Sequence, residues 1–174
     1  MAQEKSALTY AQPARPNLHM LSVTTYLIIA VIMLDQFSKR SIAGILQPGD
    51  FVPLTSFFNV TYVWTHGLSY IFYNFDCAFL VSSCAIVWDI TVLVILNRWR
   101  LQVNTWSTTF GLGLAMGGLI SSIFDHMRFG AVTDIFDLHI GGFHICAFGF
   151  AEIGLVTGIG ILILEMLFAE EEAP

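Results

Sequence analysis

The sequence is poor in charged residues, which make up only 11% of its 174 positions. Soluble domains carry about 25% charged residues and about 45–50% apolar residues. Here apolar residues reach 56%, a composition that excludes an ordinary soluble domain and indicates a membrane protein. Basic residues are also scarce, with seven lysines and arginines against 13 acidic residues and a net charge of −6. This balance predicts that nucleic acid is not a partner.

Cysteine is equally rare, and Cys77, Cys84 and Cys146 form no C-x-x-C motif. In apolar surroundings we expect them to be packing residues. A standard zinc spacing is also missing, because His139 and His144 lie five positions apart in a glycine-containing loop. We therefore predict no metal and no other cofactor, and we expect both histidines to bond to the backbone.

Four apolar stretches are long enough to cross a bilayer, which takes about 20 residues. None alternates like a barrel strand, so helices are expected. One membrane domain over residues 19–168 is predicted to hold these spans, at about residues 20–38, 77–97, 104–125 and 149–168. Residues 1–18 and the acidic tail 169–174 would lie outside the membrane. Asp89, inside the second span, is expected to make a polar contact between helices.

Residues 50–73 differ from the spans because they are rich in aromatic and β-branched residues. This pattern predicts a short sheet on the membrane surface, where aromatic rings are favoured. Residues 134–146 are similarly mixed and are expected to lie on the surface too. The predicted fold class is therefore an all-α membrane protein with four transmembrane helices and a small sheet, which the family resemblance given below implies to be a small periplasmic β-cradle.

An even number of spans places both termini on one side of the membrane. The positive-inside rule favours cytoplasmic termini, with four basic residues on that side (Lys5, Arg15, Arg98, Arg100) against three on the other (Lys39, Arg40, Arg128). The cradle would then face the periplasm. Glycine pairs in the third span (Gly113, Gly117) and the fourth (Gly154, Gly158) predict close helix packing.

Asp134 follows the third span and Glu152 begins the fourth, so the two residues are expected at the same depth. Two carboxyl groups that share a site cannot both ionise cheaply, so one keeps its proton. An aspartic protease uses this asymmetry: the ionised group takes a proton from water and the neutral group donates to the scissile carbonyl. The structural alternative is that Asp134 begins a turn and Glu152 caps a helix.

Asp35 and Lys39 lie four positions apart at the end of the first span. A carboxylate and an ammonium at this spacing share a helix face and can pair. The alternative is a capped helix end with a lysine that extends to the membrane surface.

Two of these segments resemble motifs of the lipoprotein signal peptidase family, also called signal peptidase II, a family of bacterial inner-membrane aspartic proteases. Residues 35–39 are similar to D-Q-x-[ST]-K. Residues 57–63, which include Asn59, are similar to F-F-N-L-T-Y-V, with Gly67 as the glycine that follows.

The resemblance continues through the second half of the chain. Residues 117–130, which include Asp125 and Arg128, resemble G-G-A-x-G-N-x-I-D-R-x-x-x-G. Residues 132–137 resemble V-V-D-F-I-D, and residues 148–152 fall where the family has F-N-x-A-D. The resemblance implies cleavage of the signal peptide of diacylglyceryl-modified prolipoproteins. It implies catalysis by Asp134 and Glu152, with nine supporting or substrate-binding residues: Asp35, Lys39, Asn59, Thr65, Gly67, Ser122, Asp125, His126 and Arg128.

The sequence departs from the family pattern around one site. Glu152 stands in place of the second catalytic aspartate, and Gly149 in place of its accompanying asparagine. Thr65, Ser122 and His126 replace other polar residues of the family and are candidates to restore the lost contacts. Two interpretations follow: a divergent active peptidase, or a non-catalytic relative that binds a lipid, a lipopeptide or another membrane subunit.

Overall fold

The computed structural model describes residues 17–65, 92, 105–141 and 143–171. Three helices in this part of the chain are long and apolar enough to cross a membrane: α1 (Leu18–Ala43), α3 (Trp106–Phe129) and α4 (Phe150–Glu171). They match the predicted first, third and fourth spans, although each helix extends beyond its predicted end. The α4 helix continues as far as Glu171. The second span, with Asp89, Cys77 and Cys84, lies outside the described residues.

The strands form one antiparallel sheet in the order β1-β2-β3-β4. Its members are β1 (Phe51–Pro53), β2 (Phe58–Thr65), β3 (Val132–Ile140) and β4 (Phe143–Phe148). The predicted cradle over residues 50–73 therefore supplies only two of the four strands. Residues 134–146, which are expected to lie on the membrane surface, belong to the β3–β4 hairpin.

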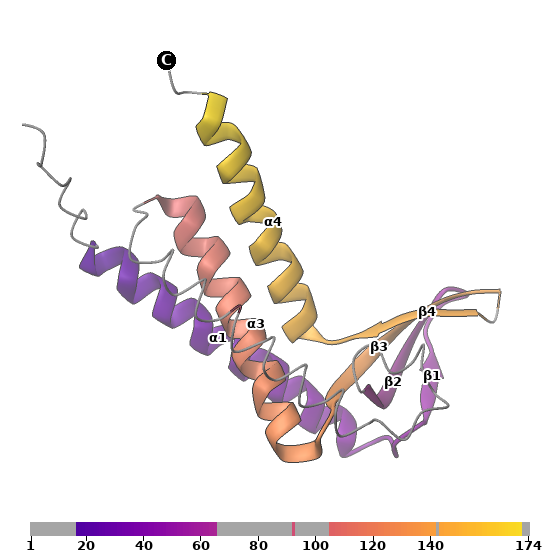
Figure 1. Cartoon of the computed structure of the whole chain (residues 1–174). Coiled ribbons are helices and arrows are strands. Elements are labelled where there is room, and N and C mark those ends of the chain that lie inside the picture. The colour runs from indigo at the N-terminus through magenta and orange to yellow at the C-terminus, as the bar shows by residue number, and fades with distance from the viewer. Residues whose placement is uncertain (1–16, 66–91, 93–104, 142, 172–174) are drawn as a thin grey trace, which may run out of the picture.

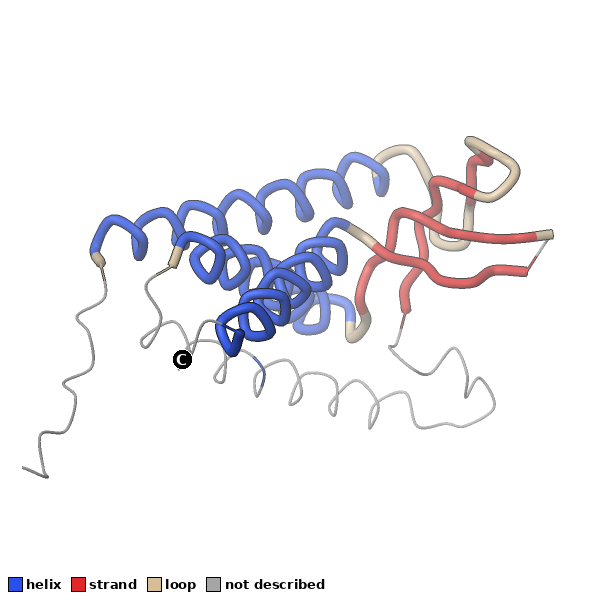
Figure 2. Tube along the Cα trace, turned by 90° about the horizontal axis from the view of Figure 1, so that it is seen from above, coloured by secondary structure: helices blue, strands red, loops and turns tan. Residues whose placement is uncertain are grey.

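The sheet lies at one end of the helices, where α1 and α3 end and α4 begins (Figures 1 and 2). The turn from α3 into β3 depends on Gly130, whose φ of 68° is left-handed and whose N–H bonds to the His126 carbonyl. Glycine adopts this conformation without strain and commonly ends helices in this way. The sheet and the beginning of α4 are thereby brought to the same end of the helices.

The α3 helix is the central member of the described helices and contacts both α1 and α4. In the apolar stretch of α3 that could span a membrane, 67% of the residues are buried. The corresponding share is 11% for α1 and 22% for α4. Its buried side chains Leu112, Ala115, Met116 and Leu119 form the core cluster with Leu162 of α4. The exposed apolar faces of α1 and α4 suit contact with lipid.

Glycines allow these helices to approach closely, but the predicted pairs do not all lie at the contact between α3 and α4. Gly113 and Gly117 of α3 face α1, where an added Cβ would lie 2.8 Å from Leu27 and Val31 side chains respectively. The contact between α3 and α4 instead uses Gly118 and Gly158, where a Cβ would come within 2.3 Å and 2.5 Å of the facing backbone. Close packing of small residues is thus present on both sides of α3.

Candidate functional site

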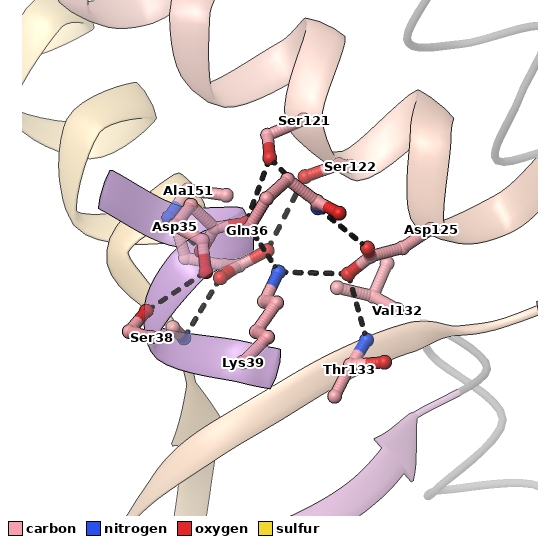
Figure 3. A network of polar contacts seen from close by, with 12 residues as sticks. Asp35, Gln36, Ser38, Lys39, Ser121, Ser122, Asp125, Val132, Thr133 and Ala151 are labelled. Carbon is pink, nitrogen blue, oxygen red and sulfur yellow. Dashed lines mark hydrogen bonds and ion pairs between the residues drawn. The ribbon is translucent and has the colours of Figure 1, made fainter. Parts of the chain in front are cut away.

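A buried lysine organises the polar residues at the sheet end of the helices (Figure 3). The Lys39 ammonium lies 2.7 Å from Asp35 Oδ2 and 2.7 Å from Asp125 Oδ2. Asp35 is fully buried and Lys39 is 5% exposed. The predicted pairing of Asp35 with Lys39 is confirmed, whereas a lysine that extends to the membrane surface is ruled out by this burial.

Each aspartate also receives neutral donors, so the charges are well satisfied. Asp35 accepts hydrogen bonds from the Ser121 hydroxyl at 2.7 Å and from the Ala151 backbone N–H at 2.9 Å. Asp125 accepts from the Gln36 amide at 2.9 Å and from the Thr133 backbone N–H at 3.1 Å. The cluster therefore joins α1 and α3 to the first residues of β3 and α4, the two segments that carry the candidate catalytic carboxyl groups.

Asp134 lies inside β3 and is 3% exposed, so the expectation that it begins a turn is wrong. The Thr65 hydroxyl donates to its Oδ2 at 2.6 Å, and its buried Oδ1 has no hydrogen-bond partner among the described residues. Burial, followed by the negative charge of Glu152, raises the pKa of Asp134 from 3.8 to about 7, against the opposing effects of Thr65 and Lys39. A proton is therefore available on this carboxyl group near neutral pH.

Glu152 lies in the first turn of α4 and is half-buried. Its Oε2 accepts a hydrogen bond from the Gly149 backbone N–H at 2.8 Å, and its Oε1 accepts one from the Ser122 hydroxyl at 3.3 Å. Glu152 therefore caps the helix as the structural alternative holds, and it also acts electrostatically on Asp134. The two interpretations of this residue do not exclude each other.

Two of the three substituted positions contact the candidate carboxyl groups directly: Thr65 binds Asp134 and Ser122 binds Glu152. The third, His126, is 5% exposed, and its Nδ1 lies 3.1 Å from the Ser122 carbonyl oxygen. Since that oxygen only accepts, Nδ1 is the donor. The Nε2 of His126 has no partner among the described residues.

A second polar group connects the strands of the sheet. Asp137 accepts hydrogen bonds from the Asn59 amide at 2.9 Å and from His144 Nδ1 at 2.7 Å. The expectation that both histidines bond to the backbone is thus wrong for His144, because the hairpin register brings it to a carboxylate. Across the described residues, no cluster of three or more His, Cys, Asp or Glu side chains could hold a metal ion.

The remaining predicted residues fall outside this arrangement. Arg128 is exposed and lies over the Phe129 ring at 5.0 Å, with no ion pair among the described residues. Gly67 lies outside the described residues. Gln36 and Ser121 of the buried cluster, and Asp137 of the sheet, are not among the residues predicted from the sequence. Gln36 stands inside the D-Q-x-[ST]-K motif, so its position next to Asp35 was an available signal.

The fold and the site together define a membrane protein with paired carboxyl groups where its helices meet a sheet. Residues 27–168 match the family model described as signal peptidase (SPase) II. The chain belongs to the signal peptidase II family, whose members are aspartic endopeptidases.

Several relatives resemble the chain over most of its length. A lipoprotein signal peptidase of Oleidesulfovibrio alaskensis is 32% identical, with 83% of this chain and 92% of the relative covered. One from Coxiella burnetii (strain Dugway 5J108-111) is 29% identical, with 86% and 92% covered. A solved structure of a bacterial membrane enzyme has a TM-score of 0.74 at 19% identity and covers 88% of this chain and 93% of its own. This last likeness bears on the fold alone.

Proposed function

We propose that this chain hydrolyses the signal peptide of diacylglyceryl-modified prolipoproteins, with Asp134 and Glu152 as its two catalytic carboxyl groups. The family match and the relatives named lipoprotein signal peptidase support the peptidase over the non-catalytic alternative. The observation that carries the assignment of the site is the state of Asp134. It is a buried carboxyl group with a pKa raised to about 7, and one of its oxygens has no hydrogen-bond partner among the described residues.

The environments of the two carboxyl groups suit different roles. The Gly149 N–H, the Ser122 hydroxyl and the positive end of the α4 dipole all stabilise negative charge on Glu152. Asp134, which is buried and close to that charge, retains a proton more readily. We therefore assign Glu152 as the general base and protonated Asp134 as the general acid.

Peptide hydrolysis then proceeds in two steps. Glu152 removes a proton from water as the water oxygen attacks the scissile carbonyl carbon, and Asp134 gives its proton to the carbonyl oxygen. The resulting tetrahedral gem-diol is neutral. When the C–N bond breaks, Glu152 returns its proton to the leaving nitrogen and Asp134 recovers one from the collapsing diol. The products are a carboxylic acid and a free amine, and no covalent enzyme intermediate forms.

The position of the site fits a substrate that is anchored in lipid. Asp134 lies near the start of β3 and Glu152 in the first turn of α4. Both segments lie where the helices meet the sheet (Figure 1). A diacylglyceryl group can remain between the helices and the bilayer while the peptide bond reaches this border. The substrate class is therefore a lipid-modified prolipoprotein in the bilayer, and no cofactor takes part in the proposed reaction.

Cleavage of a synthetic diacylglyceryl lipopeptide by the purified full-length chain tests the proposal. We expect Asp134→Asn to lower kcat by about 100-fold to 10,000-fold, the usual contribution of general acid–base catalysis. Asp50→Asn is a matched control, because the exposed side chain of this aspartate accepts a hydrogen bond from the nearby Gln47 N–H and contacts no candidate catalytic group among the described residues. A wild-type chain that binds the lipopeptide without cleaving it would instead establish the non-catalytic alternative.

Orientation is a separate part of the proposal, with cytoplasmic termini and the sheet in the periplasm of a bacterial inner membrane. Cys146 of β4 is exposed and free, so it can report on the side of the sheet. We expect a membrane-impermeant maleimide to label intact spheroplasts at Cys146 and to lose that signal in Cys146→Ser. If Cys146 is labelled only after lysis, the sheet lies on the cytoplasmic side and the proposed orientation is wrong.

A further inference from the structure

Gly149 occupies the junction between β4 and α4, and its environment explains why it has no side chain. The described residues with positive φ are Gly49, Gly130 and Gly141, so Gly149 does not need glycine for its backbone conformation. It is buried among the polar groups of the site. Space, not backbone freedom, is therefore what glycine provides at this position.

The atoms around Gly149 belong to functional side chains. A Cβ at this position would lie 3.1 Å from Glu152 Oε2, 3.2 Å from Asp35 Oδ1 and 3.2 Å from Lys39 Cε. Two of these three atoms are carboxylate oxygens that already hold hydrogen bonds. A methyl group at these distances would force at least one carboxylate to move and would offer it no hydrogen bond in return.

The same space allows an unusual cap for α4. Gly149 is the N-cap, because its carbonyl accepts the first helical bond from Ile153 N–H at 3.3 Å. A polar N-cap side chain normally accepts from the second or third helical N–H. Here Asp35 of α1 performs that task for the Ala151 N–H, at 2.9 Å (Figure 3). Glu152 reaches back to the Gly149 N–H, as in half of a capping box.

We propose that Gly149 is a positioning residue and that Gly149 and Glu152 form a matched pair. The bare Cα of Gly149 gives the longer Glu152 side chain room to fold back, so that its carboxyl group is fixed between the Gly149 N–H and the Ser122 hydroxyl. The extra methylene of glutamate is thereby accommodated without moving α4. This inference rests on the proposed role of Glu152 in catalysis.

The pairing has a consequence that neither residue has alone. Shortening Glu152 to aspartate withdraws the carboxyl group from Ser122 and from its present position beside Asp134. Adding a side chain at position 149 pushes the glutamate carboxyl group out of the same position. When both changes are made, the shorter carboxylate no longer occupies the space that the new methyl group requires. Each single change should therefore be harmful. In the double variant, the shorter side chain at position 152 should relieve the clash caused by the new methyl group at position 149.

A double-mutant cycle on the full-length chain tests this pairing by lipopeptide cleavage. We expect Glu152→Asp to lower kcat by about 10-fold to 100-fold, since a displacement of about 1 Å can cost about 100-fold. Gly149→Ala should lower kcat less, because contacts of 3.1 Å and 3.2 Å are relieved by smaller shifts. The double variant Gly149→Ala/Glu152→Asp should lose less activity than the product of the two single losses. A glycine that acts independently of Glu152 would not produce this coupling.

Gly154 provides the matched control one turn further along α4. Its added Cβ would make contacts of similar closeness, 3.3 Å to the Leu114 carbonyl and 3.3 Å to Val31 Cγ1, but none to the polar site. Any loss of activity in Gly154→Ala should be unchanged when Glu152→Asp is added. If Glu152→Asp also reduced the activity loss caused by Gly154→Ala, the coupling would not be specific to Gly149.

Thermal unfolding of the same variants separates this inference from the proposed function. Coupling between positions 149 and 152 should also appear in the midpoint temperatures, with the double variant more stable than the sum of the single losses predicts. If the wild type cleaves nothing, the proposed function fails, and the thermal cycle alone decides whether the pair is matched. Additive effects in both activity and midpoint temperature would overturn the matched pair.

Discussion

The Lys39 ammonium lies 2.7 Å from the Asp125 carboxylate, and these two residues are 86 positions apart in the chain. The contact joins the last turns of α1 to the last turns of α3. Because Asp125 also accepts from the Thr133 backbone N–H at the start of β3, the ion pair fixes the strand that carries Asp134. A buried charge cluster in the helices thus holds the candidate catalytic strand in place.

Replacing Lys39 by methionine should destabilise the chain severely. Asp35 and Asp125, 0% and 2% exposed, would lose their common cation and keep buried charges. Removing one partner of a buried ion pair costs about 3–5 kcal/mol. Thermal unfolding in detergent measures the loss. Arg40→Gln is the control, because the Arg40 side chain is exposed and a charge near a helix end contributes less than about 1 kcal/mol to stability. Equal midpoints for both variants would contradict the prediction.

The pH dependence of cleavage should report on Asp134. If this residue donates a proton, activity falls as pH rises through its pKa of about 7. The Thr65 hydroxyl lowers the pKa of Asp134 because it stabilises the carboxylate. Thr65→Val should therefore raise that pKa and move the alkaline limb of the kcat profile to higher pH.

Thr61→Val is the matched control for this profile. Thr61 lies in the same strand, but its hydroxyl donates to the Asp50 backbone carbonyl at 2.9 Å and not to a carboxyl group of the site. The alkaline limb of Thr61→Val should coincide with that of the wild type. If instead the acidic limb, where activity rises with pH, moved to higher pH in Thr65→Val while the alkaline limb stayed in place, Asp134 would act in its ionised form.

Local rules predicted the helices and the Asp35–Lys39 pair well, because both depend on residues a few positions apart. They failed where the chain forms contacts across a hairpin. His144 was expected to bond to the backbone, yet it binds Asp137, since the β3–β4 register places the two on one face. The same reason explains why residues 134–146 were not recognised as strands: their pairing partners lie partly in β2.

In the candidate site, too, the sequence predicts what depends on nearby residues and not what depends on contacts in the folded chain. Asp134 and Glu152 were identified from their positions at the ends of two apolar stretches. The role of Gly149 was not, because only the folded chain shows that Asp35, Lys39 and Glu152 surround it. Nor could the glycine pairs be assigned to their partner helices, since Gly113 faces α1 and Gly118 faces α4.

Gly118→Ala should disrupt the contact between α3 and α4. The new Cβ would lie 2.3 Å from the Ala151 carbonyl oxygen and 2.9 Å from the Leu155 backbone nitrogen, neither of which can move without shifting α4. Overpacking of this kind costs about 1–3 kcal/mol, and cleavage should fall with it because Glu152 moves with the helix. In Gly160→Ala the new Cβ meets no atom of the described residues within 4 Å, so this variant should keep the wild-type midpoint. Equal thermal midpoints for the two variants would show that α3 and α4 tolerate the added methyl group.

The stability of the folded chain should depend on pH through Asp134. Its pKa rises from 3.8 to about 7 on folding, so the folded state binds more protons between these values. The contribution of Asp134 to the free energy of unfolding is therefore fully present below pH 3.8. It is lost as pH rises through about 7, and the loss is on the order of 4 kcal/mol. Asp134→Asn cannot ionise and should show a flatter profile of midpoint temperature between pH 4 and 8, with the variant more stable than the wild type at the alkaline end. Because Asp50 is exposed, Asp50→Asn should keep the wild-type slope. Parallel profiles for Asp134→Asn and the wild type would mean that Asp134 is ionised in the folded chain, which would also remove the basis for its role as the general acid.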